Sequence, residues 1–134
     1  MALPEWKGLR MSEAEVFARL AAGSAMLCAA LAAAWLLFNR HLLALFGAGY
    51  APVAGLVARR NAALFLGIAL LLWRASSTPD ADVRTMVGQG VGLACATLAG
   101  LGALDFQCRR AGPWIWLAIA TEATLAAAFF YFGV

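Results

Sequence analysis

The 134-residue sequence is short of charge: only 13% of its residues are charged, whereas 64% are hydrophobic. An average soluble domain carries roughly 25% charged residues. A chain of this length cannot bury so much apolar surface in one water-soluble core. The shortage of charge therefore excludes an ordinary soluble domain and indicates that lipid is the solvent of this protein.

Histidine and paired cysteine are also scarce. The single histidine, His41, excludes a bis-histidine haem site within the chain, and no cluster of residues has the ligands that a metal needs. The three cysteines include no Cys-x-x-Cys pair, so thiol–disulfide chemistry has no support. No phosphate loop or catalytic triad is recognisable. The sequence favours a non-enzymatic protein without metal or cofactor.

What the sequence does contain is four apolar runs, each long enough to cross a bilayer, which takes roughly 20 helical residues. They lie at about 16–38, 52–73, 85–104 and 114–132. We therefore predict an all-α fold, an integral membrane bundle of four transmembrane helices that forms a single domain over residues 1–134.

Local signals mark where these helices begin. Ser12 followed by Glu15 predicts a capping box at the start of the first helix. Thr78 followed by Pro79 predicts the N-cap and first helical position of the third helix. The pair at 112–113, Gly-Pro, breaks the chain before the last helix. The apolar connection at 41–52 has two interpretations, a short segment that lies in the interface or a simple extension of the first helix.

The four spans put both termini on one side of the membrane, here named side A, and the opposite side is named side B. Interfacial aromatic residues agree with this assignment. Those of side A are Trp6, Trp73 and Tyr131, and those of side B are Trp35, Tyr50, Trp114 and Trp116. The basic residues are Lys7, Arg10, Arg19, Arg74 and Arg84 on side A and Arg40, Arg59, Arg60, Arg109 and Arg110 on side B. Because the basic residues divide equally, the positive-inside rule does not decide the orientation. They flank or interrupt apolar runs, which indicates bilayer anchoring and not nucleic-acid binding.

Arg59 and Arg60 interrupt the second span, about 11 Å from its start near position 52. Glu122 lies about 13 Å into the last span, which also enters from side B. Because a lone carboxylate in the membrane is costly, we predict that Glu122 pairs with one of these arginines. The pair either fixes the packing of two helices or binds a ligand or proton.

Further polar residues lie in the same half of the bilayer and could form a vestibule open to side B: His41, Asn61, Asp105 and Thr121. The third span carries the clearest periodic signal, small residues at every fourth position: Gly88, Gly92, Ala96 and Gly100. Such a ladder lets helices approach closely, either inside the bundle or against another protein chain. The first span has a matching series (Ala21, Ala25, Ala29 and Ala33), so we predict that the first and third spans pack together.

Three short stretches stand out beside the overall length: Arg60 with the segment LFLGIALLLWR at 64–74, the turn at 79–80 with Arg84, and the Gly-Pro-Trp sequence at 112–114. In these the chain resembles the small four-helix bacterial membrane proteins called DoxX-like. Some members of that group are associated with quinone-linked oxidation as small subunits, so the resemblance implies a quinone-handling subunit as a further alternative.

We therefore expect a non-enzymatic accessory or scaffolding subunit that packs in the bilayer against other membrane chains or against itself. The alternative is a small transporter, or a ligand- or proton-binding bundle, that uses Glu122 with Arg59 or Arg60. Nine of the ten basic residues are arginine and alanine is abundant, which is typical of a GC-rich bacterial gene. We expect the location to be a bacterial inner membrane.

Overall fold

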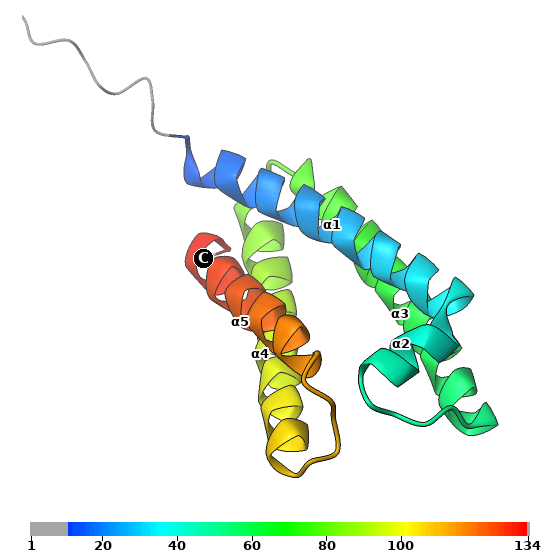
Figure 1. Ribbon diagram of the computed structural model, residues 1–134. Coiled ribbons are helices and arrows are strands. Elements are labelled where there is room, and N and C mark those ends of the chain that lie inside the picture. The colour runs from blue at the N-terminus through cyan, green and yellow to red at the C-terminus, as the bar shows by residue number, and fades with distance from the viewer. Residues whose placement is uncertain (1–10, 134) are drawn as a thin grey trace, which may run out of the picture.

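The computed structural model describes residues 11–133 as an all-helical chain (Figure 1). Its helices are α1 (Glu13–Leu37), α2 (Asn39–Leu45), α3 (Pro52–Ser76), α4 (Ala81–Gln107) and α5 (Ile115–Phe132). All but α2 are long and apolar enough to cross a membrane. The prediction of an all-α membrane bundle with four transmembrane helices is confirmed. Trp6, Lys7 and Arg10, which we assigned to side A, lie outside the described residues.

The first helix begins where its capping signal predicts. The Ser12 hydroxyl accepts the Glu15 amide at 3.2 Å, and the Glu15 carboxylate accepts the Ser12 amide at 3.0 Å. The predicted N-cap of α4 is wrong by two residues. Asp80 is the cap, since its carboxylate accepts the backbone amide of Asp82 at 2.9 Å. Thr78 instead accepts the Asp80 amide at 3.3 Å, so this hydroxyl supports the turn before the helix.

The connection after α1 is a separate short helix and not an extension. The backbone breaks at Phe38, whose φ of −125° is not helical, and α2 then runs over Asn39–Leu45 in a new direction (Figure 1). The ring of Phe46 stacks on Trp35 with centroids 6.3 Å apart. This aromatic contact folds the connection back against the end of α1.

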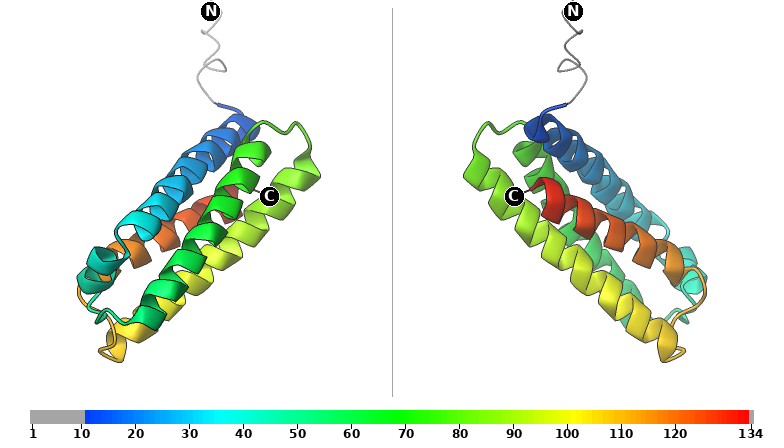
Figure 2. Two further views of the ribbon diagram at one scale, coloured as in Figure 1. Left: turned by 90° about the vertical axis from the view of Figure 1, so that its right-hand side faces the viewer. Right: turned by 90° about the vertical axis from the view of Figure 1, so that its left-hand side faces the viewer.

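The long helices pack as two hairpins. α1 packs along α3, and α4 packs along α5, while contacts between the hairpins are far fewer (Figures 1 and 2). The predicted packing of the first span against the third is therefore wrong, because α1 takes α3 as its main partner. Within the first hairpin the buried face is built from alanine: Ala21, Ala25 and Ala32 of α1 and Ala58, Ala62 and Ala69 of α3. Such small side chains let two helix backbones approach closely in lipid.

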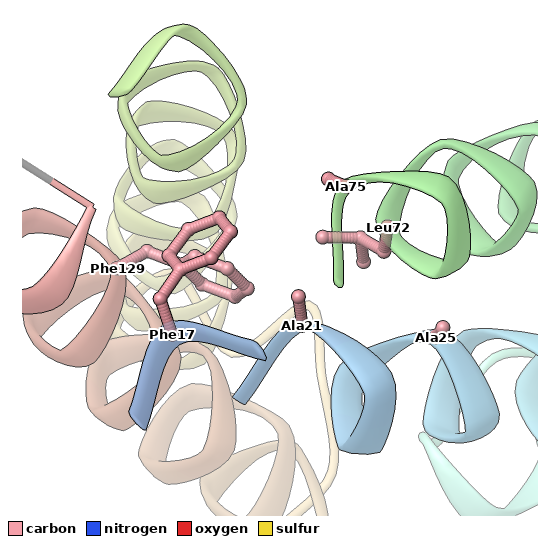
Figure 3. Close-up of a cluster of buried hydrophobic side chains, with 6 residues drawn as sticks. All are labelled: Phe17, Ala21, Ala25, Leu72, Ala75 and Phe129. Carbon is pink, nitrogen blue, oxygen red and sulfur yellow. The ribbon is translucent and has the colours of Figure 1, made fainter. Parts of the chain in front are cut away.

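The hairpins meet through side chains at the side A end. Phe17 of α1 and Phe129 of α5 are both fully buried, and their rings lie edge to face with centroids 6.2 Å apart (Figure 3). Leu72 and Ala75 of α3 complete this core. It therefore joins α1, α3 and α5 close to the side A surface of the membrane.

The side B end is closed by backbone. The amide of Gly112, in the α4–α5 connection, donates to the Phe46 carbonyl at 2.8 Å. Gly47 has a φ of +80°, and a Cβ atom there would lie 2.8 Å from the Gly112 nitrogen. Only glycine fits both the backbone conformation and the close approach.

Candidate functional site

The arginines that interrupt α3 face outward. Arg59 and Arg60 are both exposed, and neither takes part in an ion pair within residues 11–133. The one ion pair in that part of the chain joins Arg110 and Asp105, both exposed, at 4.0 Å. The predicted pairing of Arg59 or Arg60 with Glu122 is therefore not formed.

The reason is the direction of the side chains and not their depth. α3 and α5 belong to different hairpins and do not pack along each other. Residues that share a helix face recur every three or four positions, so Arg60 lies on the stripe of Leu56 and Leu64, which are 51% and 66% exposed. This stripe faces lipid. Matched depths along two helices do not bring their side chains together when one of them points out of the bundle.

Glu122 points the other way, toward the interior. It is half-buried and lies on the inward stripe of α5, with Ile119 and Ala126 buried one turn on either side. Within residues 11–133 its carboxylate has neither an ion-pair partner nor a hydrogen-bond donor. Glu122 is thus an interior acid that the described part of the chain leaves without a counter-charge.

One ionisable group of another helix in the neighbourhood of Glu122 is a cysteine. Cys95 of α4 lies within electrostatic range of both Glu122 and Cys28 of α1, and both thiols are half-buried. Cys28 also packs against the core that joins the hairpins. Thiols are weak hydrogen-bond donors and carry no positive charge at neutral pH. Neither thiol therefore supplies a counter-charge to the Glu122 carboxylate.

The four residues of the predicted vestibule do not gather. Thr121 uses its hydroxyl within α5, donating to the Leu117 carbonyl at 2.8 Å. Asp105 forms an ion pair with Arg110 at 4.0 Å, and His41 lies against the Phe38 ring on the exposed side of the short helix α2. Asn61 is exposed on α3. The prediction failed because a position in the same half of the bilayer does not turn side chains toward one another, and all four residues are exposed on different helices.

A shallow, open groove runs along α5 instead. It is lined by Ala120, Thr121, Thr124 and Leu125. The Thr124 hydroxyl donates to the Ala120 carbonyl at 2.7 Å, so the hydroxyls of both threonines form hydrogen bonds within α5. Within residues 11–133, no three histidine, cysteine, aspartate or glutamate side chains lie together as metal ligands.

The small-residue ladder of α4 divides between two surroundings. Gly88 and Gly92 are buried against α5, where added Cβ atoms would meet the Gly133 backbone and the Phe130 ring. Ala96 and Gly100 are exposed, and nothing lies within 4 Å of a Cβ atom placed on Gly100. The predicted four-residue stripe is therefore a packing surface only in its first half.

The packing face continues through residues that the predicted stripe omits. Ala99 and Gly102 are buried, and a Cβ on Gly102 would lie 2.9 Å from Ile119 of α5. An α-helix has 3.6 residues per turn, so a strict four-residue repeat drifts away from a straight partner. Alternating steps of three and four residues from Gly92 would have found both positions.

Two further features escaped the sequence analysis. The guanidinium of Arg40 lies 4.4 Å from the ring centroid of Tyr50, a cation–π contact between residues ten apart across an irregular connection. The hydroxyl of Ser24 is buried in α1 and has no partner in the described part of the chain. Neither has a periodic signal, because each depends on how α1 and the connection fold onto their neighbours.

Comparison of the chain with protein-family models, with curated proteins and with solved structures gives no match. The resemblance to DoxX-like membrane proteins therefore stays a prediction, and the site is interpreted from its own geometry.

Proposed function

We propose that this protein is a non-enzymatic accessory or scaffolding subunit that associates sideways, within the bilayer, with another membrane chain or with a second copy of itself. The exposed half of the α4 ladder carries the proposal. Ala96 and Gly100 lie one turn apart on a lipid-facing surface, with open space around Gly100. Small residues on a transmembrane surface are typical of helix–helix contacts, since they allow a partner's backbone to come close.

The rest of the bundle is consistent with such a role. The connection between α3 and α4 is only residues 77–80, and only a minority of each membrane-crossing segment is buried within the bundle. Most of the side surface is therefore available for lateral contacts. The location that we propose is a bacterial inner membrane, which is supported by the preference for arginine over lysine and the abundance of alanine.

The substitution Gly100→Leu tests this proposal. A Cβ atom at Gly100 meets nothing within 4 Å, so we expect the isolated chain to fold as before while the larger side chain blocks the lateral contact. The matched control is Gly67→Leu on α3, where a Cβ atom also meets nothing within 4 Å.

The measurement is the size of the particle extracted from native membranes in polymer-bounded lipid discs. We expect wild type and Gly67→Leu to travel in a larger assembly, and Gly100→Leu to appear as the lone chain. A wild-type protein that is already a lone chain in these discs, or a Gly100→Leu variant with the wild-type assembly, would rule the proposal out.

Proton or ligand binding by Glu122 is a second candidate function. The observation that favours it is a carboxylate on the inward face of α5 without a counter-charge in the described part of the chain. An ionisable residue inside a membrane protein marks a functional site by default. The arginines no longer belong to this hypothesis, because they point outward.

Purified protein in vesicles that enclose a pH-sensitive dye separates the two candidates. If Glu122 carries protons, wild-type vesicles lose an imposed pH gradient faster than Glu122→Gln vesicles do. The control is Glu13→Gln, which removes an exposed carboxylate at the side A surface. Equal rates for wild type, Glu122→Gln and empty vesicles would reject proton transport and leave the subunit role standing alone.

A further inference from the structure

The two ends of the bundle differ in net charge although their basic residues are equal in number. Within residues 11–133 side B carries five arginines: Arg40, Arg59, Arg60, Arg109 and Arg110. Apart from the inward-facing Glu122, its one acid there is Asp105, which lies 4.0 Å from Arg110. The described residues of side A carry more acids than bases, since Arg19, Arg74 and Arg84 are outnumbered by Glu13, Glu15, Asp80 and Asp82. Side B is therefore the strongly positive end.

Arg40 and Arg59 are brought to the same end of α3. The Arg40 guanidinium lies over the Tyr50 ring, 4.4 Å from its centroid. The Tyr50 hydroxyl lies against the first turn of α3, where a Cβ on Gly55 would be 2.9 Å away. Arg59 follows Gly55 by one helical turn, a rise of about 6 Å. The contact with Tyr50 thus places the Arg40 guanidinium near the side B end of α3, the same end that carries Arg59.

Arg60 adds a third guanidinium from the lipid-facing side. It lies about 12 Å along α3 from Pro52, on a surface shared with the exposed Val53 and Leu64. A guanidinium cannot remain at that depth among acyl chains, so the long side chain extends toward the side B headgroups. The nearest anions in that direction are lipid phosphates.

We propose that Arg40, Arg59 and Arg60 form a binding site for the phosphate of an anionic phospholipid in the side B leaflet. The guanidinium group suits this ligand because its fork binds phosphate oxygens through two parallel hydrogen bonds. No carboxylate of residues 11–133 forms an ion pair with any of the three arginines, so their charge is available to a ligand. The inference is independent of the proposed subunit role.

The neighbouring loop strengthens the field around this site. The hydrogen bond from Gly112 to Phe46 ties the α4–α5 connection to the segment that follows α2. Arg109 and Arg110 therefore belong to the same end of the molecule as Arg40. Arg109 has a φ of +55°, a conformation that costs free energy for any residue other than glycine.

The test is native mass spectrometry of the purified, delipidated full chain with phosphatidylglycerol or phosphatidylcholine added. The variant is the double substitution R59Q/R60Q. The matched control is R19Q/R74Q, which removes two exposed arginines of side A and changes the net charge equally. Each basic residue near an anionic surface contributes about a fivefold change in binding, so we expect R59Q/R60Q to lose about 25-fold in preference for phosphatidylglycerol. The control should keep the wild-type preference.

Two further measurements fix the nature of the ligand. Raising the salt concentration should weaken the wild-type preference, since partly exposed charges are screened. Millimolar inorganic phosphate should leave the lipid bound, because a free ion lacks the acyl chains that bring the headgroup to the arginines.

Three outcomes would overturn the proposal. They are an unchanged preference in R59Q/R60Q, an equal loss in R19Q/R74Q, and competition by free phosphate as strong as that of the lipid. A photo-crosslinker at position 64 tests for a protein partner in intact membranes. If it captures an acidic peptide of another protein and no lipid, the arginines belong to a contact with an acidic partner helix instead. Because R59Q/R60Q removes two charges from exposed positions, a circular dichroism spectrum equal to that of wild type is expected and is recorded for every variant.

Discussion

At the side A end of the bundle, Phe17 and Phe129 bury their rings against each other and against Leu72, so side chains from three helices hold the two hairpins together. At the side B end, the hairpins touch through the backbone, where the Gly112 amide donates to the Phe46 carbonyl. The two hairpins are thus held together by side-chain packing at side A and by a backbone hydrogen bond at side B, next to the turn at Gly47. Glu122 lies on α5 between these two contacts.

This difference shows how a small membrane bundle uses two distinct sources of stability. Lipid is as apolar as the side chains that it surrounds, so helices in a bilayer gain little from hiding hydrophobic surface. What remains is close packing, as in the aromatic core, and satisfaction of backbone groups, as in the turn at Gly47 and Gly112. Each source can be removed separately, which makes the comparison testable.

The largest effect is expected from the aromatic core. Phe129→Ala removes a fully buried ring from the contact between α1 and α5. We expect a loss of about 3 kcal/mol, at the low end of Phe→Ala in soluble cores because lipid weakens the transfer component. The measurement is unfolding by SDS in mixed micelles, followed by tryptophan fluorescence. The control Leu117→Ala alters a side chain that is 67% exposed and should change stability by under about 0.5 kcal/mol.

The second largest loss of stability is expected from Gly47, in the turn at side B. Gly47→Ala places a Cβ 2.8 Å from the Gly112 nitrogen on a residue whose φ is +80°. Left-handed backbone costs roughly 1–2 kcal/mol for a residue with a Cβ atom, and the clash adds to it, so we expect a loss of about 2 kcal/mol. Gly49→Ala, two residues away, meets no atom within 4 Å and should be nearly silent. Equal midpoints for the two variants in the SDS titration would mean that this turn does not fasten the hairpins.

A third comparison lies within one helix. Gly88→Ala places a Cβ 2.8 Å from the Gly133 Cα and 3.2 Å from the Phe129 carbonyl oxygen, so the end of α5 must move. We expect a loss of about 1–2 kcal/mol from overpacking. Gly90→Ala lies on the open side of α4, meets nothing within 4 Å, and should gain about 0.5–1 kcal/mol from helix propensity. Thermal unfolding in lipid discs measures both, and variants that shift in the same direction would contradict the assignment of the α4 packing face.

The elements of the fold were predictable because they depend on local signals. A continuous apolar run of about 20 residues is expected to form a helix in a bilayer, since a helix satisfies all of its backbone groups within the segment. The starts at Glu13, Pro52 and Ile115 follow from a capping box or from proline close to the helix start. The wrong N-cap predicted for α4 is a choice between two capping residues, Thr78 and Asp80, that lie two positions apart.

The site was not predictable because it depends on the direction of each side chain around its helix. Depth follows directly from a rise of about 1.5 Å per residue, and this placed Arg60 and Glu122 at similar levels. Which helices become neighbours is a tertiary property, and the hairpin pairing α1–α3 and α4–α5 separates the two charges. One signal in the sequence did bear on the question: Leu56 and Leu64 share a stripe with Arg60, which gives that surface the large apolar side chains typical of a lipid-facing surface.

The smallest effect is expected at the turn that follows α4, where Arg109 has a φ of +55°. Glycine is the residue that ends helices in this conformation at no steric cost, so Arg109→Gly should stabilise the bundle by up to about 1 kcal/mol. Arg109→Ala is the matched control: it removes the same charge but keeps the Cβ atom, so it should show no gain. Both are compared with wild type by SDS titration. A gain shared by glycine and alanine would trace the effect to repulsion between arginines at this positive end, and a loss in both would show that the Arg109 charge itself holds the turn.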